Sequence, residues 1–264
     1  MQKLISISNQ KGGVGKTTTA VNLASCIANL GIQTLLIDAD PQANATTGMG
    51  IEPGSDGSTI YEVLVTDKKA GEVIQKTQIE NLYIIKSHIN LVAAELELVA
   101  LQDREVMLRN KIRELSSPES GYNFRFVFID CPPSLGLITL NSLNAADSVL
   151  IPVQCEYYAL EGLSALLNTI KLVKNSFNPA LTIEGYLLTM FDSRLKLANQ
   201  VEAELRKYFA DKVYKTKIAR NVKIGEAPSY GKPIVEYDPY SLGARHYADL
   251  AEEFIERNQI TIKY

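Results

Sequence analysis

A glycine-rich segment near the N-terminus constrains the fold of this chain more than any other feature. It occupies residues 10–18 and reads Gln-Lys-Gly-Gly-Val-Gly-Lys-Thr-Thr. An apolar alternation over residues 4–8 precedes it and a helical pattern begins near Thr17, so the order is strand, loop, helix. Glycines in such a loop let successive backbone N–H groups face one anion. The segment therefore predicts a phosphate-binding loop.

Two side chains at the end of this loop are expected to bind different parts of a nucleotide and its metal ion. Lys16 is expected to reach the β- and γ-phosphates of a nucleotide, and the Thr17 hydroxyl is expected to bind Mg²⁺. The loop departs from the usual G-x-x-x-x-G-K-[ST] pattern, because Gln10 replaces the first glycine and a second lysine, Lys11, lies inside the loop. The extra lysine distinguishes this loop from most phosphate-binding loops and limits the families of protein to which the chain can belong.

Strand-like apolar runs alternate with helical patterns along the rest of the chain. Strands are expected at residues 3–8, 34–38, 82–86, 126–130, 148–153 and 183–190, with a weaker one at 213–218. Helices are expected at 17–30, 92–115, 136–144, 160–177, 198–209 and 241–257. The alternation predicts an α/β fold of the P-loop NTPase class, with a mostly parallel twisted sheet flanked by helices on both faces. We expect a single domain over residues 1–264, with 50–58 as a surface loop.

Composition argues against membrane and secreted classes. No apolar run approaches the roughly 20 residues of a membrane-spanning helix, and the N-terminus leads directly into a strand without signal-peptide architecture. Cys26, Cys131 and Cys155 lie far apart with no C-x-x-C spacing. This pattern favours free thiols in a reducing cytoplasm over a disulfide or metal framework.

The net charge of −3 gives no sign of nucleic-acid binding, but the charges are unevenly distributed. Between residues 194 and 223, nine basic residues face three acidic ones, which leaves a local excess of 9 − 3 = +6. Two interpretations stay open at this point. The segment forms either a solvated helix face with an edge strand or a binding surface for an anionic partner.

Aspartates follow two of the predicted buried strands, at the edge where open α/β sheets bind ligands. Asp130 ends the apolar run 126–130 and, with a phosphate loop in the same chain, is expected to hold Mg²⁺ directly or through water. Asp38 and Asp40 are two residues apart in an extended segment, so both carboxylates can face one ligand. One is expected to approach the magnesium and its waters while the other orients an attacking water. A turn before Pro41 is the alternative for this pair.

Several motifs together resemble those of the ParA/Soj branch of the ParA/MinD ATPases. Residues 9–24 are similar to the deviant Walker A loop of these ATPases, which carries the extra lysine. Residues 38–46 resemble the D-x-D-P-Q-x-N-x-T segment, and residues 130–136 resemble the D-x-P-P-S-x-G segment. Residues 219–229 and 231–234 resemble the C-terminal R-N-V-x-h-x-E-A-P-S and G-K-P-I motifs. The resemblance covers nearly the whole chain and is greatest to chromosomal members that lack an N-terminal specificity domain.

The resemblance implies an ATP-dependent homodimer with weak ATPase activity, in which ATP and Mg²⁺ are held between two subunits. By motif position, Lys11 is the lysine that reaches the partner's phosphates, and Gly12 lies where the two loops meet. Asp130 is implied as the Walker B acid, and the implied catalytic residues are Lys11, Lys16 and Asp40. The implied nucleotide-binding residues are Lys11, Gly12, Gly13, Val14, Gly15, Lys16, Thr17, Thr18 and Asn221. The implied metal ligands are Thr17, Asp38 and Asp130.

The resemblance also implies a role in partitioning a chromosome or plasmid. The ATP dimer is expected to bind double-stranded DNA without sequence preference, through Arg194, Arg220 and Lys223. A ParB-like protein is expected to stimulate the hydrolysis that releases the DNA. These expectations place the protein on the nucleoid in the cytoplasm, with no membrane contact.

Two alternatives stay open. A MinD-like membrane-associated ATPase shares Lys11, Lys16 and Asp40. Its basic amphipathic membrane helix, however, differs from residues 248–257 of this chain, which are acidic on their polar face. The second alternative is a slow-hydrolysing, nucleotide-switched DNA-binding regulator.

Overall fold

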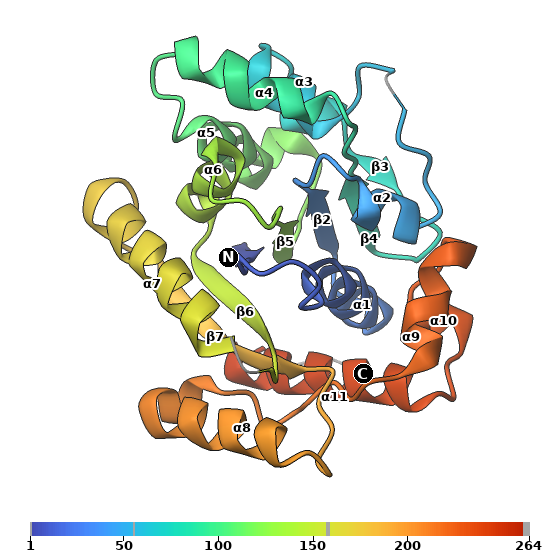
Figure 1. Ribbon diagram of the computed structural model, residues 1–264. Helices are drawn as coiled ribbons and strands as arrows, with labels where there is room; N and C mark the ends of the chain where they lie inside the picture. Colours follow the sequence, from blue (N-terminus) through green and yellow to red (C-terminus); the bar gives the residue numbers. More distant parts are fainter. Residues whose placement is uncertain (1, 55, 157–158, 261–264) are drawn as a thin grey trace.

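The computed structural model describes residues 2–54, 56–156 and 159–260, which are built around one seven-stranded sheet (Figure 1). The strands are β1 Lys3–Ile7, β2 Thr34–Asp38, β3 Gln75–Lys76, β4 Leu82–Ile85, β5 Phe126–Asp130, β6 Ser148–Gln154 and β7 Thr182–Thr189. Their order in the sheet is β3-β4-β2-β5-β1-β6-β7. Neighbouring strands are parallel, except that β3 is antiparallel to β4. The predicted α/β fold with a mostly parallel sheet is confirmed.

Helices cover both faces of the sheet. The longer ones are α1 Lys16–Asn29, α6 Leu137–Ala145, α7 Ala159–Ser176, α8 Lys196–Phe209 and α11 Leu242–Arg257. The shorter ones are α2 Asn44–Gly48, α3 Ile60–Val65, α4 Leu91–Glu97, α5 Met107–Arg113, α9 Val222–Glu226 and α10 Ile234–Tyr237. In the described part of the chain, no helix has the length and apolar character needed to cross a membrane.

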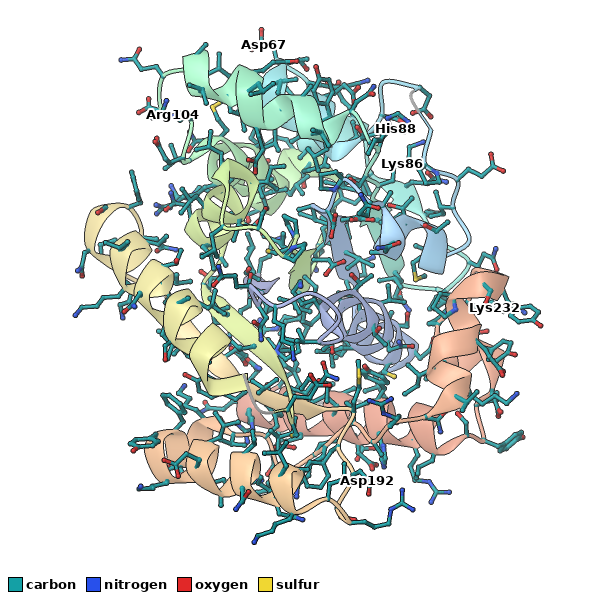
Figure 2. All side chains as sticks on the ribbon, in the orientation of Figure 1. Asp67, Lys86, His88, Arg104, Asp192 and Lys232 are labelled. Atoms are coloured by element: carbon teal, nitrogen blue, oxygen red, sulfur yellow. The ribbon has the colours of Figure 1, made fainter. Side chains whose placement is uncertain are left out.

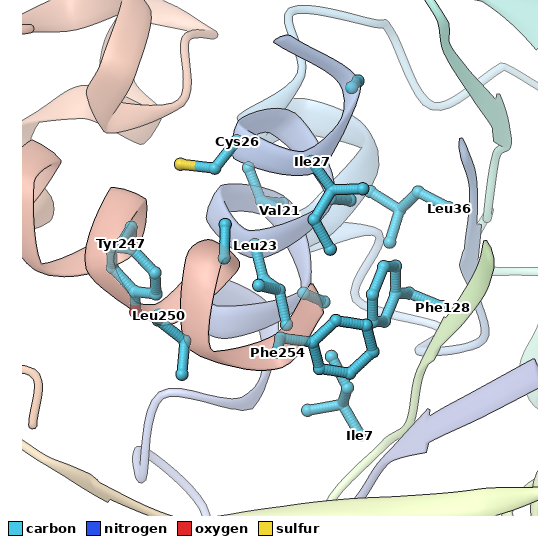
Figure 3. Packing of buried hydrophobic residues seen from close by; sticks show 14 of the residues in the cluster. Ile7, Val21, Leu23, Cys26, Ile27, Leu36, Phe128, Tyr247, Leu250 and Phe254 are labelled. Carbon is cyan, nitrogen blue, oxygen red and sulfur yellow. The ribbon is translucent and has the colours of Figure 1, made fainter. Parts of the chain in front are cut away.

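The central strands are buried on both faces because alternate residues enter different cores. Leu36 and Phe128 pack with α1 and with Phe254 of α11 (Figure 3). Leu35 and Val127 lie in the cluster on the opposite face, with residues of α3 to α6. Each central strand therefore needs apolar residues at successive positions, which explains the continuous apolar runs in the sequence.

Most predicted elements are present, with bounds that differ from the expected ones by at most two residues. The described residues of the 50–58 loop contain no helix or strand, as predicted. The short β3, α2, α3, α9 and α10 were not predicted, because segments of two to six residues carry too little periodicity to be recognised.

The prediction of one helix over residues 92–115 is wrong. The segment forms α4 and α5, each followed by a short 3-10 turn, with a break between them. Asp103 in the break has a φ of 56°, in the left-handed region that no helix interior contains. Asn141 of α6 stabilises the break, because its Oδ1 accepts the N–H of Leu108 at 3.1 Å and its amide donates to the Arg104 oxygen at 2.7 Å.

The prediction of a weak strand over residues 213–218 is also wrong. Isolated bridges link this part of the chain to the sheet, such as that between Val213 and Tyr186 of β7. The physical reason is Glu253 of α11, whose carboxylate accepts the N–H groups of Lys215 at 2.9 Å and Thr216 at 2.8 Å. These two amides bond to α11 and cannot extend a ladder.

Candidate nucleotide-binding site

The loop between β1 and α1 forms an open cradle of backbone N–H groups. Gly13 and Gly15 have φ values of 73° and 85°, a left-handed conformation that glycine adopts without strain. Gly15 occupies the N-cap position of α1, and none of the described side chains caps this helix. Its first N–H groups and the positive end of its dipole are therefore free to bind an anion. The buried Val14 is anchored by the Thr189 hydroxyl, which donates to the Val14 oxygen at 2.8 Å.

Lys16 is the first residue of α1, and its side chain folds back over the loop. The residue is 7% exposed, and its Nζ donates to the backbone oxygen of Lys11 at 3.1 Å. Burial lowers the pKa of Lys16, whereas the carboxylates of Asp130 and Asp40 act to raise it. The ammonium thus lies in the field of two acids at the centre of the cradle. Thr17 and Thr18 follow it in the first turn of α1.

Asp130 lies at the end of β5, beside the ends of β1 and β2. The strand register pairs it with Ile7 on one side and with Asp38 on the other. Its side chain is fully buried, and neither carboxylate oxygen makes a well-aligned hydrogen bond within the described residues, although the Thr17 hydroxyl lies near enough to act on its pKa. Burial raises the pKa of Asp130 well above its ordinary value, and the charge of Asp38 adds to the rise. A buried carboxylate with so few donors suits a cation, and the assignment of Asp130 as a metal ligand stays a prediction.

Asp38 is equally buried, but its oxygens are occupied. Oδ1 accepts the N–H of Asp40 at 3.1 Å, and Oδ2 accepts the N–H and the hydroxyl of Thr46 at 2.8 and 2.7 Å. Burial nevertheless raises the pKa of Asp38 to about 6. These contacts favour a role for Asp38 in holding the loop before α2, and its assignment as a metal ligand stays a prediction. Sequence reasoning did not single out Thr46, although it is the last residue of the D-x-D-P-Q-x-N-x-T motif.

Asp40 lies in the same loop, close to the phosphate cradle. It is 7% exposed, and its Oδ1 accepts the N–H of Gln42 at 2.9 Å. The charge of Asp40 also acts on the pKa of Lys16, which places these two side chains near each other. The position suits a group that orients water at the γ-phosphate, and the hydrolytic role of Asp40 stays a prediction.

Lys11 has surroundings unlike those of Lys16. Its Nζ forms an ion pair with Glu156 Oε2 at 2.6 Å, just beyond the end of β6. The two side chains are 32% and 49% exposed, so this pair lies at the rim of the site. Gly12 next to it has nothing within 4 Å of the position of a Cβ, and the loop therefore borders open space there. Sequence reasoning missed Glu156, because no local motif connects it with the loop.

Two adjoining cavities flank the start of α1. One has a volume of about 330 Å³ and is lined by Gly15, Thr18 and Asn221, among others. The other, of about 500 Å³, is lined by residues that include Thr17, Thr18 and Lys232, the last of which is labelled in Figure 2. Asn221 Oδ1 accepts two N–H groups of α9, those of Lys223 at 2.8 Å and Ile224 at 3.3 Å, which fixes one wall of the smaller cavity. A nucleotide base beside the phosphate loop fits such a cavity.

The predicted DNA-contacting residues are more strongly paired than the sequence indicated. Arg194 binds Asp192, which is labelled in Figure 2, at 2.6 Å, and Lys223 binds Glu226 at 2.8 Å. Both acids lie just outside the 194–223 segment, so the excess of +6 overstates the free positive charge. The charge of Arg220 acts on the pKa of Asp192, which places it near Arg194. The role of these three basic residues in DNA binding stays a prediction.

The arrangement fits a nucleotide bound with Mg²⁺. Asp130 supplies a buried carboxylate beside the Thr17 hydroxyl, and the glycine loop and Lys16 supply donors for phosphate oxygens. The described residues include no group of three or more His, Cys, Asp or Glu side chains that could hold a metal ion by itself. A nucleotide-bound Mg²⁺ needs only one or two protein ligands, since phosphates and waters supply the others.

Comparisons with known proteins agree with this geometry. A family model for an AAA domain matches residues 2–183. The chain is 55% identical over 253 residues to the sporulation initiation inhibitor protein Soj of Bacillus subtilis, covering 96% of this chain and 98% of that protein. It is 47% identical over 258 residues to the chromosome-partitioning ATPase Soj of Treponema pallidum, covering 98% and 99%. Structures of cobyrinic acid a,c-diamide synthase from Mycobacterium smegmatis, with magnesium and ADP or an ATP analog, are 31% identical, with a TM-score of 0.83 and coverage of 98% and 96%.

Proposed function

The chain belongs to the ParA/Soj family of chromosome-partitioning ATPases, and we propose that ATP converts it into a dimer that binds DNA without sequence preference. A ParB-like protein stimulates hydrolysis, and hydrolysis returns the protein to a monomer that releases the DNA. The observation that carries this proposal is the contrast between the two lysines of the loop. Lys16 is buried among the acids of the site, whereas Lys11 is paired with Glu156 at its rim.

Hydrolysis requires the positioning of charges rather than a strong base. Lys16 neutralises the β- and γ-phosphates from within the loop, and Asp40 orients the attacking water. Thr17 and Asp130 would hold Mg²⁺, which would supply positive charge to offset that of the phosphates. Burial raises the pKa of Asp130, and a bound cation would offset this shift by favouring the charged form of the carboxyl.

Dimerisation follows from the position of Lys11. A lysine at the rim leaves Glu156 and reaches the phosphates bound by a second copy, so its charge completes the site only in the dimer. Gly12 gives the two loops room to approach, since no described atom lies near the position of its Cβ. Nucleotide state and association are thereby coupled, as they are when an arginine is supplied in trans.

The basic loops around Arg194 and Arg220 contact DNA phosphates in this proposal. Each copy offers only a modest net positive charge on these loops, because Asp192 pairs with Arg194. Two copies on one duplex raise the affinity through their effective concentration, which makes DNA binding depend on ATP and fall steeply with salt.

The proposal is tested by ATP turnover of the full chain alone, with DNA, and with DNA plus a ParB-like protein. We expect the combination to raise turnover, and Lys16→Ala to abolish nucleotide binding. Lys11→Ala should keep nucleotide binding and lose the dimer, whereas Asp40→Ala should give a stable ATP dimer on size-exclusion chromatography. Flat turnover would contradict the partitioning cycle and favour the slow-hydrolysing regulator. Asp40→Ala that stays monomeric with ATP would contradict the dimer.

DNA binding is tested with Arg194→Glu and a matched control, Arg113→Glu on α5. Arg113 is exposed like Arg194 but lies outside the basic loops. We expect Arg194→Glu to weaken the ATP-dependent gel shift without changing dimerisation, and Arg113→Glu to leave both unchanged. Equal gel shifts for wild type and Arg194→Glu would contradict the assigned DNA surface.

A further inference from the structure

The loop that follows Asp130 leads into α6, and this helix lacks a side-chain cap of its own. Gly136 occupies the N-cap position, and no hydrogen bond from an N-cap side chain is present there in the described structure. The N–H groups of the first turn therefore need an acceptor from elsewhere. α4 lies on the same side of the sheet (Figure 1) and shares a hydrophobic cluster with α6.

Glu95 of α4 supplies that acceptor. Its Oε1 accepts the N–H of Ile138, in the first turn of α6, through a long hydrogen bond of 3.5 Å. The same carboxylate fills the space of the missing side chain of Gly136, because a Cβ there would lie 2.1 Å from Oε1 and 2.4 Å from Oε2. The φ of Gly136 is −78°, which any residue adopts. A Cβ at this position would displace the Glu95 carboxylate from its contact, and the negative charge placed there suits the positive end of the helix dipole.

Two further hydrogen bonds hold the loop over residues 131–136, one at its start and one near its middle. The Cys131 N–H donates to the Ile7 oxygen at 3.2 Å, and the Thr139 hydroxyl donates to the Ser134 oxygen at 2.6 Å. Pro133 and Ser134 between these points are exposed. Glu95 ties the far end of the loop to α4.

We propose that Glu95 is a positioning residue for ATP hydrolysis. Its carboxylate lies in the space beside Gly136 and accepts an N–H of the first turn of α6. This contact fixes the end of the loop that begins at Asp130. This inference rests on the ATPase function proposed above. It concerns turnover rather than nucleotide binding, because the phosphate cradle and Lys16 belong to β1 and α1.

A double-mutant cycle of Glu95→Ala and Gly136→Ala in the full chain tests the proposal. One change deletes the carboxylate, and the other places a Cβ in its space, so both remove the same contact. We expect each single variant to lower kcat for ATP about fivefold with little change in KM, and the double variant to lose no more than either single one. Additive losses, about 25-fold in the double variant, would overturn the proposal. The matched control is Gly162→Ala in α7, where a Cβ meets nothing within 4 Å, and its kcat should be unchanged.

Two further measurements separate positioning from general loss of structure. Glu95→Gln keeps an acceptor oxygen and should restore part of the turnover that Glu95→Ala loses. Amide hydrogen exchange of residues 131–140 in the nucleotide-free protein should quicken in Glu95→Ala and Gly136→Ala but not in Gly162→Ala. Unchanged exchange in the first two variants would refute the cap. A wild-type protein without ATP turnover would refute the proposed function and with it the role in hydrolysis, while the exchange rates still decide whether Glu95 caps α6.

Discussion

A buried carboxylate lies at each end of the parallel strands, and the two differ in the hydrogen-bond donors around them. At the carboxyl ends, neither Asp130 oxygen makes a well-aligned hydrogen bond among the described residues, and burial raises its pKa despite the nearby Thr17 hydroxyl. At the amino ends, Glu184 of β7 accepts from Lys3 Nζ at 2.6 Å, the Ser148 hydroxyl at 2.7 Å and the Asn258 amide at 2.8 Å. Burial alone would raise the pKa of Glu184, but these donors outweigh it and lower the pKa.

A β-bulge accounts for the contacts of Glu184. Ile183 pairs with Val149 and Gly185 with Leu150, so Glu184 is the extra residue of β7. The bulge places its carboxylate where it meets the first residues of β1 and β6. Glu184 therefore helps to hold the strands together, whereas the burial of the Asp130 carboxylate is unfavourable to the nucleotide-free fold and fits its proposed role in binding a cation.

The largest expected effect comes from Asp130→Asn. The amide keeps the shape but cannot bind a cation as a carboxylate does, so we expect ATP turnover to fall by at least about 100-fold. The nucleotide-free protein should not lose stability, because no buried charge remains to be desolvated. Steady-state turnover and urea unfolding of the same preparation measure both. An Asp130→Asn variant that unfolds markedly earlier than wild type would break the comparison, since Asp130 would then support the fold.

Glu184→Gln is the matched change at the other end of the strands. It leaves the Lys3 ammonium without its anion and weakens two further hydrogen bonds to a charged acceptor. We expect a loss of about 2 kcal/mol in the free energy of unfolding, or a fall in Tm of roughly 5 °C. Turnover per folded molecule should be unchanged, because Glu184 touches none of the loops at the nucleotide site. A loss of turnover without a loss of stability would remove the distinction between the two acids.

The sequence identified Asp130 but not Glu184, and the reason is the range of their signals. Asp130 follows an apolar run and begins a local motif, so neighbouring residues predict it. The partners of Glu184 lie 181, 36 and 74 residues away, and a bulge brings it among them. The same limit applies to Glu156 beside Lys11 and to Glu95 beside Gly136. The positions of the main strands could be predicted because strands such as β2 and β5 are apolar over most of their length. Distant side chains decided where the 92–115 and 213–218 segments broke.

The smallest expected effect is a change with pH in the contribution of Glu184 to the free energy of unfolding. Because folding lowers the pKa of Glu184, its stabilisation is present above the ordinary glutamate pKa of about 4.3 and is lost as the pH falls through the lower folded value. The difference in unfolding free energy between wild type and Glu184→Gln should therefore stay constant from about pH 7 to 5 and shrink below about pH 4, as urea titrations at each pH would measure. The raised pKa of Asp130 has the opposite sign, since its neutral form favours the fold and this advantage is lost as the pH rises. A wild-type advantage over Glu184→Gln that grew on acidification would mean that Glu184 is a strained acid like Asp130, and the two ends of the sheet would no longer differ.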